Sequence, residues 1–203
     1  MKRIRIGTTS RPKALEIASI ITARFTCEVT FEPPSDAGPE ETGDSLRENA
    51  IIKALHYSKG HSEITLSEDT GIFCDGLKGA PGHLSARFAR KEYPDLSSRE
   101  LDKKNAQKVL DLLQGNANRE AEFRTCFVLA QSGVVIADTE AITKGLIAQK
   151  MIGEEKTDFA YDTIFMPDTG FGSTFAEMDK FRKNMRSFRK DALLHLLWEQ
   201  GFE

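Results

Sequence analysis

Residues 3–31 read RIRIGTTSRPKALEIASIITARFTCEVTF, and this stretch decides the fold class. Its first residues, Arg3–Gly7, predict a short strand. Ser10 is placed to cap a helix that continues to about Arg24. Cys27–Phe31 predicts a second strand. A strand, a helix and a strand in succession are typical of an α/β protein.

The rest of the chain continues this pattern and then turns β-rich. Helices are predicted over Ser45–Lys59, Ser97–Leu113 and Ser187–Gln200. Strands are predicted over Glu63–Ser67, Ala121–Gln131, Val134–Thr143, Gly145–Met151 and Thr163–Met166. Ser132-Gly133 has the composition of a hairpin turn. We therefore expect one mixed α/β domain over residues 1–203, with a sheet running through it.

Composition excludes several classes of protein. With 39% hydrophobic residues, the chain of 203 residues can bury a sizeable core. Its net charge of -3 argues against a nucleic-acid polymer as partner, although a local cluster of Lys and Arg can bind a small anion. No window has the length of a membrane span, and the first residues predict a strand rather than a signal peptide. The three scattered cysteines form no CxxC pair, which argues against zinc and fits a cytoplasmic protein.

An acidic pair, Glu68-Asp69, follows the predicted strand Glu63–Ser67 and precedes Gly71. Functional loops of α/β proteins often begin where strands end. Adjacent carboxylates repel each other, and a protein that seats them in a cleft usually neutralises them with a cation. The alternative is a polar turn with solvated acids, which is the commoner origin of an isolated acid pair.

The segment Glu48–Lys53 offers an acid, an amide and a cation on the helix predicted over Ser45–Lys59. Asn49 and Lys53 share one helix face, and Glu48 lies about 100° round the helix from Asn49. These three side chains can point into one polar cleft. Ser45 and Glu48 also have the spacing of a capping box, and taken alone this spacing favours the cap.

Two further segments carry groups that can bind a ligand. The glycine-rich loop Gly76–Gly82 can bring backbone N–H groups close to a phosphate, or it can be a tight connection without a ligand. It is not a Walker A loop, because the Gly-Lys-Ser/Thr ending is missing. The aromatic residues of Phe159–Asp162 and the cations of Lys183–Arg189 can stack a base and hold phosphates or carbonyls. Their alternative reading is a strand edge followed by a solvated helix start.

In this order, the segments resemble the Ham1 family of inosine and xanthosine triphosphate pyrophosphatases over nearly the whole chain. The motif Glu-Asn-Ala-x-x-Lys-Ala is intact at Glu48–Ala54, and Gly-Ala-Pro-Gly-x-x-Ser-Ala-Arg is intact at Gly79–Arg87. Thr8–Lys13 looks like the family's Thr-Gly-Asn-x-x-Lys, Glu68–Gly71 looks like Asp-Asp-Ser-Gly, and Ala176–Met178 looks like Ala-Glu-Leu. The resemblance implies the elongated mixed-sheet α/β fold of Ham1 and Maf proteins, with two lobes and a central cleft, and a homodimer.

The resemblance also implies an activity and a role for each matching residue. The family hydrolyses a nucleoside triphosphate to a nucleoside monophosphate and pyrophosphate, with Mg²⁺ and with water attacking the α-phosphate. Glu48 and Asp69 would hold Mg²⁺, Glu68 would help to hold the metal or polarise water, and Asp69 would orient the attacking water. Lys53, the third catalytic residue, would hold the phosphates. The other residues implied on the phosphate side are Thr8, Ser10, Lys13, Asn49 and Thr70. The residues implied at the base site are Phe159, Tyr161, Asp162, Lys183, Ser187, Phe188 and Arg189.

Departures from the family motifs cluster at the base site. The family's Gly-Phe-Gly-Tyr-Asp-Pro is Asp158–Thr163 here, so both glycines are lost and Ala160 cannot adopt positive φ cheaply. The family's Ser-His-Arg is Ser187–Arg189, with Phe188 in place of a His that helps to read the oxo group of inosine or xanthine. The loss of a hydrogen-bond donor relaxes or redirects such a site. We expect hydrolysis of unusual purine nucleotides such as ITP, XTP and dITP, with an altered base preference.

Other functions stay open at this point. A non-catalytic nucleotide sensor would keep the site and lose turnover, but intact Glu48, Lys53 and Asp69 argue against it. A pyrophosphatase repurposed for another nucleotide, such as a pyrimidine, would keep the phosphate side and change the base side. A Maf-type pyrophosphatase has a related architecture and is disfavoured by the intact Ham1 motifs.

Overall fold

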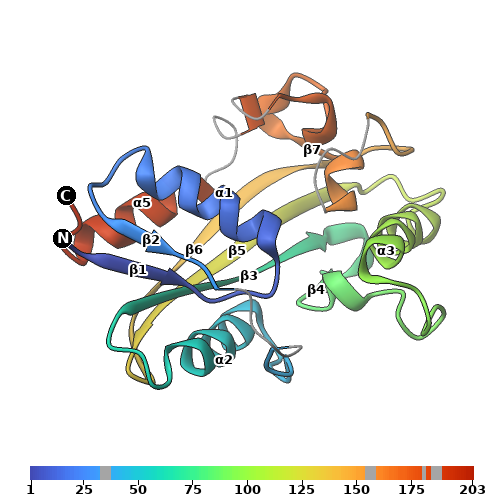
Figure 1. The fold of residues 1–203 in the computed structure, drawn as a ribbon. Coiled ribbons are helices and arrows are strands. Elements are labelled where there is room, and N and C mark those ends of the chain that lie inside the picture. Colours follow the sequence, from blue (N-terminus) through green and yellow to red (C-terminus); the bar gives the residue numbers. More distant parts are fainter. Residues whose placement is uncertain (33–37, 154–158, 180–181, 184–188) are drawn as a thin grey trace. The chain divides into compact units, whose positions relative to one another are not determined.

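The computed structural model describes residues 1–32, 38–153, 159–179, 182–183 and 189–203 (Figure 1). Its helices are α1 (Arg11–Thr22), α2 (Leu46–Ser58), α3 (Ser98–Leu112) and α5 (Arg189–Glu199). Its strands are β1 (Arg3–Ile6), β2 (Glu28–Thr30), β3 (Ile64–Cys74), β4 (Pro81–Gly82), β5 (Glu120–Gln131), β6 (Val134–Ile147) and β7 (Phe165–Pro167). No described helix is long and apolar enough to cross a membrane.

The strands of the described segments form one mixed sheet in the order β2-β1-β3-β5-β6-β7, with β4 paired to β3. β1 is parallel to both of its neighbours, and Ile4 lies opposite Val29 of β2 and Ile64 of β3. β7 is antiparallel to β6. Parallel and antiparallel pairs in one sheet, together with the helices, confirm the predicted mixed α/β class.

Serine caps fix the starts of three helices where the sequence predicts them. The side chain of Ser10 accepts a hydrogen bond from Lys13 N, and Ser45 accepts one from Glu48 N. Ser97 forms a complete capping box with the helix α3. Each cap satisfies a backbone N–H group that the first helical turn leaves without a partner.

The hairpin between β5 and β6 is also confirmed. Ser132 and Gly133 have φ values of 51° and 79°. Two successive residues with positive φ make the type I′ turn that matches the twist of two hairpin strands.

The chain divides into two compact units. The first consists of Met1–Asp69, Thr125–Ala141 and Arg189–Glu203. The second consists of Thr70–Arg124 and Ile142–Phe188. Each unit has its own hydrophobic core.

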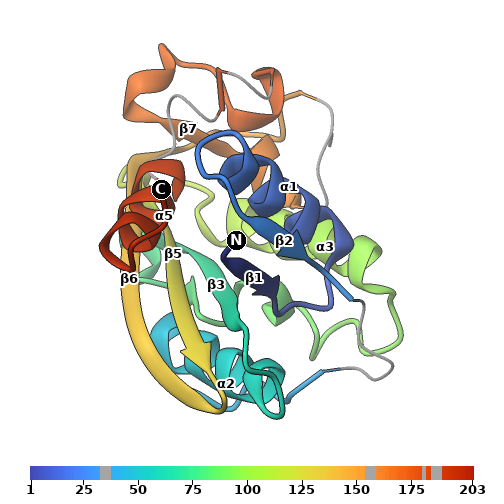
Figure 2. The same ribbon diagram turned by 60° about the vertical axis from the view of Figure 1, so that its left-hand side comes forward.

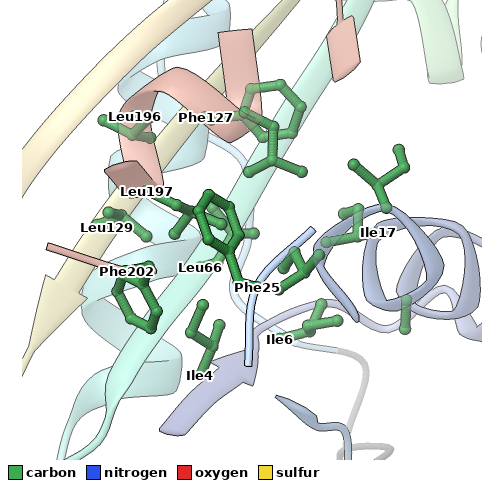
Figure 3. Close-up of a cluster of buried hydrophobic side chains, with 14 residues drawn as sticks. Ile4, Ile6, Ile17, Phe25, Leu66, Phe127, Leu129, Leu196, Leu197 and Phe202 are labelled. Carbon is green, nitrogen blue, oxygen red and sulfur yellow. The ribbon is translucent and has the colours of Figure 1, made fainter. Parts of the chain in front are cut away.

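The core of the first unit packs α1 and α5 against β1, β3 and β5 (Figure 3). Ile17 of α1 and Leu197 of α5 are 1% and 0% exposed, and they meet Ile6, Leu66 and Phe127 of the sheet. Figures 1 and 2 show α2 on the opposite face of these strands. Alternate residues of a strand point to opposite faces, so β3 presents one set of side chains to α1 and α5 and the other to α2.

The core of the second unit forms around α3 and the aromatic residues near β7. Val109 and Leu113 are fully buried at the end of α3, and Tyr161 and Phe165 pack in the same cluster. Fully buried side chains of this size each contribute about 1.5–3 kcal/mol to folding.

Three predicted boundaries are wrong. β3 continues through the acidic pair to Cys74, so Glu68 and Asp69 do not form a turn after a strand ending at Ser67. β6 runs on to Ile147 and takes the place of a separate strand from Gly145. Ala160–Thr163 form a 3₁₀ helix, and the next strand starts only at Phe165. The predicted helix start Ser187 lies outside the described residues.

Candidate active site

The acidic pair of β3 separates onto the two faces of the sheet. Glu68 shares its face with Leu66, which is the face that α1 and α5 cover. Asp69 points the other way, toward side chains of α2. The two carboxylates are 4% and 7% exposed as residues, and cations from different segments neutralise each of them. This neutralisation is the physical reason that two adjacent acids can lie inside a buried strand.

Glu68 is held between two cations. Its Oε1 lies 2.8 Å from Nζ of Lys13, and its Oε2 lies 3.6 Å from Nη2 of Arg189. Burial alone would raise the pKa of Glu68, yet Lys13 and Arg189 hold that pKa far below its usual range. Glu68 is therefore charged at neutral pH, and a carboxylate with a depressed pKa is a weak proton acceptor.

Arg189 links α5 to this cluster. Besides Glu68, its guanidinium meets Glu16 of α1, with Nη1 3.4 Å from Oε2, and it lies over the ring of Phe127 at 5.7 Å. The resemblance places Arg189 at the base site, whereas the contacts described within its unit are with two acids and a ring. This charge network joins α1, α5 and β3.

Asp69 and Glu41 meet at Lys53 on the other face. Nζ of Lys53 lies 2.8 Å from Oδ1 of Asp69 and 2.9 Å from Oε1 of Glu41. Burial alone would lower the pKa of Lys53, but Asp69, Glu68 and Glu41 raise it well above its ordinary value. Burial raises the pKa of Asp69, against the opposing effect of Lys53. The result is two carboxylates around one fixed positive charge.

Glu41 is a candidate that the sequence reading missed. It lies in a stretch rich in Pro, Gly, Ser and acids, which predicts only a loop. The sequence carries no pattern that places Glu41 beside Lys53; the structure does so at Gly43, where a Cβ would lie 2.6 Å from Cβ of Glu48. A glycine required for close packing shows that this loop is pressed onto the first turn of α2.

Glu48 and Asn49 occupy structural positions at the start of α2. Glu48 Oε2 accepts a hydrogen bond from Asp44 N at 2.7 Å, and Glu48 N donates to Ser45 Oγ at 3.1 Å. Ser45 therefore caps the helix, but the capping box is only half formed, because Glu48 accepts from Asp44 N and not from Ser45 N. Asn49 is 0% exposed, so its side chain presents no surface to a substrate.

The phosphate-side residues of the first unit surround the start of α1. Thr8 Oγ1 accepts from Ser10 N at 3.1 Å, and Ser10 Oγ accepts from Lys13 N at 3.4 Å. Both hydroxyl groups thus shape the turn that brings Lys13 to Glu68. Thr70, in the second unit, is partly exposed on β3 directly after Asp69.

The glycine-rich loop is a tight connection. The N–H groups of Lys78, Gly79 and Ala80 donate to the carbonyl oxygens of Asp75, Cys74 and Leu77 at 3.0, 2.9 and 3.1 Å. These N–H groups are used within the loop and are not presented to a phosphate. Lys78 and Gly79 take φ values of 55° and 86°, which the turn requires.

The base-side residues of the second unit have different exposures. Phe159 is partly exposed and packs against Phe123 and Tyr161, with ring centroids at 5.3 and 5.5 Å. Asp162 Oδ2 and Lys183 Nζ form an ion pair at 2.5 Å, and Lys183 lies over the ring of Phe175 at 5.5 Å. Asp162 is 3% exposed, so this arrangement offers a ligand the partly exposed ring of Phe159 and the ammonium of Lys183.

Tyr161 and Ala160 belong to the core. Tyr161 is 2% exposed and its hydroxyl donates to Ser85 O at 2.9 Å, so its ring is not a free stacking surface. Ala160 opens the 3₁₀ helix, a conformation open to any residue, so the loss of the family's glycine introduces no strain there. Ser187 and Phe188 lie outside the described residues.

Comparison with known proteins agrees with this fold. The model of the Ham1 family matches residues 4–198. The chain is 34% identical over 195 residues to a dITP/XTP pyrophosphatase of Desulforamulus reducens, covering 94% of this chain and 92% of that one. It is 32% identical over 197 residues to a dITP/XTP pyrophosphatase of Gloeobacter violaceus, covering 97% and 93%. A solved structure of a HAM1 protein from Coxiella burnetii has a TM-score of 0.79 at 29% identity and covers 98% of each chain.

The mixed sheet and the similarity to dITP/XTP pyrophosphatases over nearly the whole chain make this protein a hydrolase of the α/β structural class that acts on phosphate anhydrides. The family match over residues 4–198 and the relatives at 32–34% identity identify one family within this class. The chain belongs to the Ham1 family, as its motifs indicate.

Proposed function

We propose that this protein hydrolyses dITP, XTP and related purine nucleoside triphosphates to the monophosphate and pyrophosphate. The observation that carries the proposal is the cluster of Asp69, Glu41 and Lys53, with two carboxylates meeting one lysine. The dITP/XTP pyrophosphatases to which the chain is similar over nearly its whole length support the choice of substrate.

The donor set of this cluster suits Mg²⁺. Magnesium prefers carboxylate oxygens and needs only one or two from the protein, since it keeps several waters. The described residues contain no group of three or more metal-binding side chains, and a pair is enough for magnesium. We place Asp69 and Glu41 in this pair, because both carboxylates lie at Lys53, whereas Glu48 is exposed and contacts Asp44 N at the helix start. A bound Mg²⁺ would offset negative charge on the phosphate oxygens.

The residues on the two faces of β3 have different roles in binding the phosphates and activating water. Lys53 and Lys13 offset charge that develops on the phosphates. Asp69 is the better proton acceptor of the two acids, because its pKa is raised whereas that of Glu68 is depressed. Its carboxylate therefore orients the attacking water and receives a proton from it, while Glu68 holds Lys13 in place.

The base side is proposed to read a purine oxo group. The ammonium of Lys183 can donate to a carbonyl oxygen, and the buried carboxylate of Asp162 holds this ammonium in place. Phe159 supplies the partly exposed ring. The homodimer and the cytoplasmic location stay predictions.

A substrate panel tests the proposal. Purified protein is incubated with Mg²⁺ and ITP, XTP, dITP or one of the common nucleoside triphosphates, and pyrophosphate is measured. We expect the highest kcat/KM with dITP and XTP, and loss of turnover when EDTA removes the metal. Selective turnover of a pyrimidine nucleotide would show a repurposed base site. Thermal stabilisation by a nucleotide without any product would show a binding protein instead.

A further inference from the structure

Both polar atoms of the fully buried Asn49 side chain form hydrogen bonds. Its Oδ1 accepts a hydrogen bond from Gly43 N at 2.9 Å, and its Nδ2 donates to Asp69 Oδ2 over a longer distance of 3.5 Å. The residue is 0% exposed. A buried polar side chain is retained at little cost only where its hydrogen bonds are made, and here one of them reaches the acid of the cluster.

The loop that Asn49 holds is the one that carries Glu41. Two successive loop amides, those of Gly43 and Asp44, donate to the side chains of two successive helix residues, Asn49 and Glu48. A Cβ on Gly43 would lie 2.8 Å from Oδ1 of Asn49, so the loop backbone rests directly on this amide. Glu41, two residues earlier, thereby reaches Lys53.

The helix α2 therefore carries both residues that hold Glu41 and Asp69 together. Lys53 follows Asn49 by one helical turn, so both side chains lie on the same face of α2. Lys53 forms ion pairs with the carboxylates of Asp69 and Glu41. Asn49 accepts a hydrogen bond from Gly43, in the loop that carries Glu41, and donates one to the side chain of Asp69. The Asn49 side chain thus positions Glu41 by holding the backbone of its loop. It orients the carboxylate of Asp69 by donating to Oδ2 of that residue.

We propose that Asn49 is a positioning residue that couples the Glu41 loop to the carboxylate of Asp69, and not a substrate ligand. The inference rests on the proposed function in assigning Asp69 and Glu41 to the metal. Only an amide of this size both accepts from Gly43 and donates to Asp69, since a carboxylate lacks the donor and an apolar side chain lacks both.

The test compares Asn49→Leu with a matched control, Asn105→Leu. Asn105 is also 0% exposed, and its amide accepts from Ala89 N at 2.7 Å and donates to Ala86 O at 3.1 Å. Mn²⁺ affinity is measured by calorimetry without nucleotide, together with Tm, kcat and KM for dITP. We expect both variants to lower Tm, and only Asn49→Leu to weaken Mn²⁺ binding and lower kcat, by about 10–100-fold. KM should stay within about threefold, because the amide makes no substrate contact in the proposal.

Asn49→Asp keeps the acceptor for Gly43, removes the donor to Asp69 and places a second negative charge beside that carboxylate, and it covers the case in which Asn49→Leu does not fold. It should lower kcat with KM unchanged. The inference is overturned if Asn49→Leu matches Asn105→Leu in Mn²⁺ affinity and kcat, or if either Asn49 variant raises KM with kcat unchanged. A wild-type protein that releases no pyrophosphate would refute the proposed function alone, because the Mn²⁺ affinities would still decide the role of Asn49.

Discussion

Asp69→Asn is expected to lower kcat for pyrophosphate release about 10³-fold while the protein stays folded. The amide has nearly the shape of the carboxylate, but it neither accepts a proton from water nor balances the charge of a divalent cation. Lys53 keeps Glu41 as a partner at 2.9 Å, so the buried ammonium is not left alone. Kinetics with dITP and Mg²⁺ measure the loss, and circular dichroism checks the fold.

Asp138→Asn is the matched control for this prediction. Asp138 lies on β6 in the same unit, and its carboxylate pairs with Arg47 at 2.7 Å, outside the candidate site. We expect the control to keep wild-type kcat. If Asp69→Asn lost no more activity than Asp138→Asn, Asp69 would have no part in catalysis.

Glu68→Gln is expected to destabilise the protein by about 3 kcal/mol, which corresponds to a fall in Tm of about 6–12 °C for a chain of this size. The substitution removes the negative charge between Lys13 and Arg189 and leaves two cations facing each other. This free energy is at the lower end of the range for breaking a buried ion pair, because the side chain of Lys13 is 30% exposed. Thermal unfolding monitored by circular dichroism measures the change.

The destabilisation by Glu68→Gln should depend on pH in one direction. The pKa of Glu68 is lower in the folded protein than in an unfolded chain, where a glutamate has a pKa of about 4.3. The stabilising contribution is therefore fully present above that value and is lost as pH falls toward the folded-state pKa. The difference in Tm between wild type and variant should be constant from about pH 6 to 8 and should narrow below about pH 4.

Glu92→Gln is the control for this second prediction, because Glu92 pairs with Lys108 at an exposed position. Surface pairs of this kind contribute little, so its Tm should stay close to that of wild type. A Glu68→Gln protein that unfolded at the wild-type temperature would show that the charges around Glu68 do not hold α1 and α5 to β3.

Local chemistry made part of the fold predictable. Ser10 and Ser45 cap their helices as predicted, and Ser132-Gly133 forms the predicted hairpin, because each of these signals acts within a few residues. The length of β3 could not be read in this way. In the sequence, an acidic pair indicates the end of a strand. In the structure the strand continues, because Lys13 and Lys53 from two other segments neutralise the two acids, and sequence periodicity does not show such partners.

The candidate site was predictable as a set of segments, but not as a set of contacts. Asp69 and Lys53, which the resemblance assigns to the metal and the phosphates, form an ion pair with each other. Glu41 was missed because a loop has no periodicity that could place it beside Lys53. Asn49 and Tyr161 look like ligand-binding residues by type, yet both are buried. Burial depends on tertiary packing, which a single sequence does not display.

The proposed reaction requires water to attack the α-phosphorus and pyrophosphate to leave. Hydrolysis of dITP by the wild-type protein with Mg²⁺ in ¹⁸O-labelled water shows which phosphorus is attacked, because ³¹P NMR locates the label. We expect one ¹⁸O atom in the phosphate of dIMP and none in the pyrophosphate. Label in the pyrophosphate, or release of inorganic phosphate in its place, would show attack at a different phosphorus and would rule out the proposed reaction.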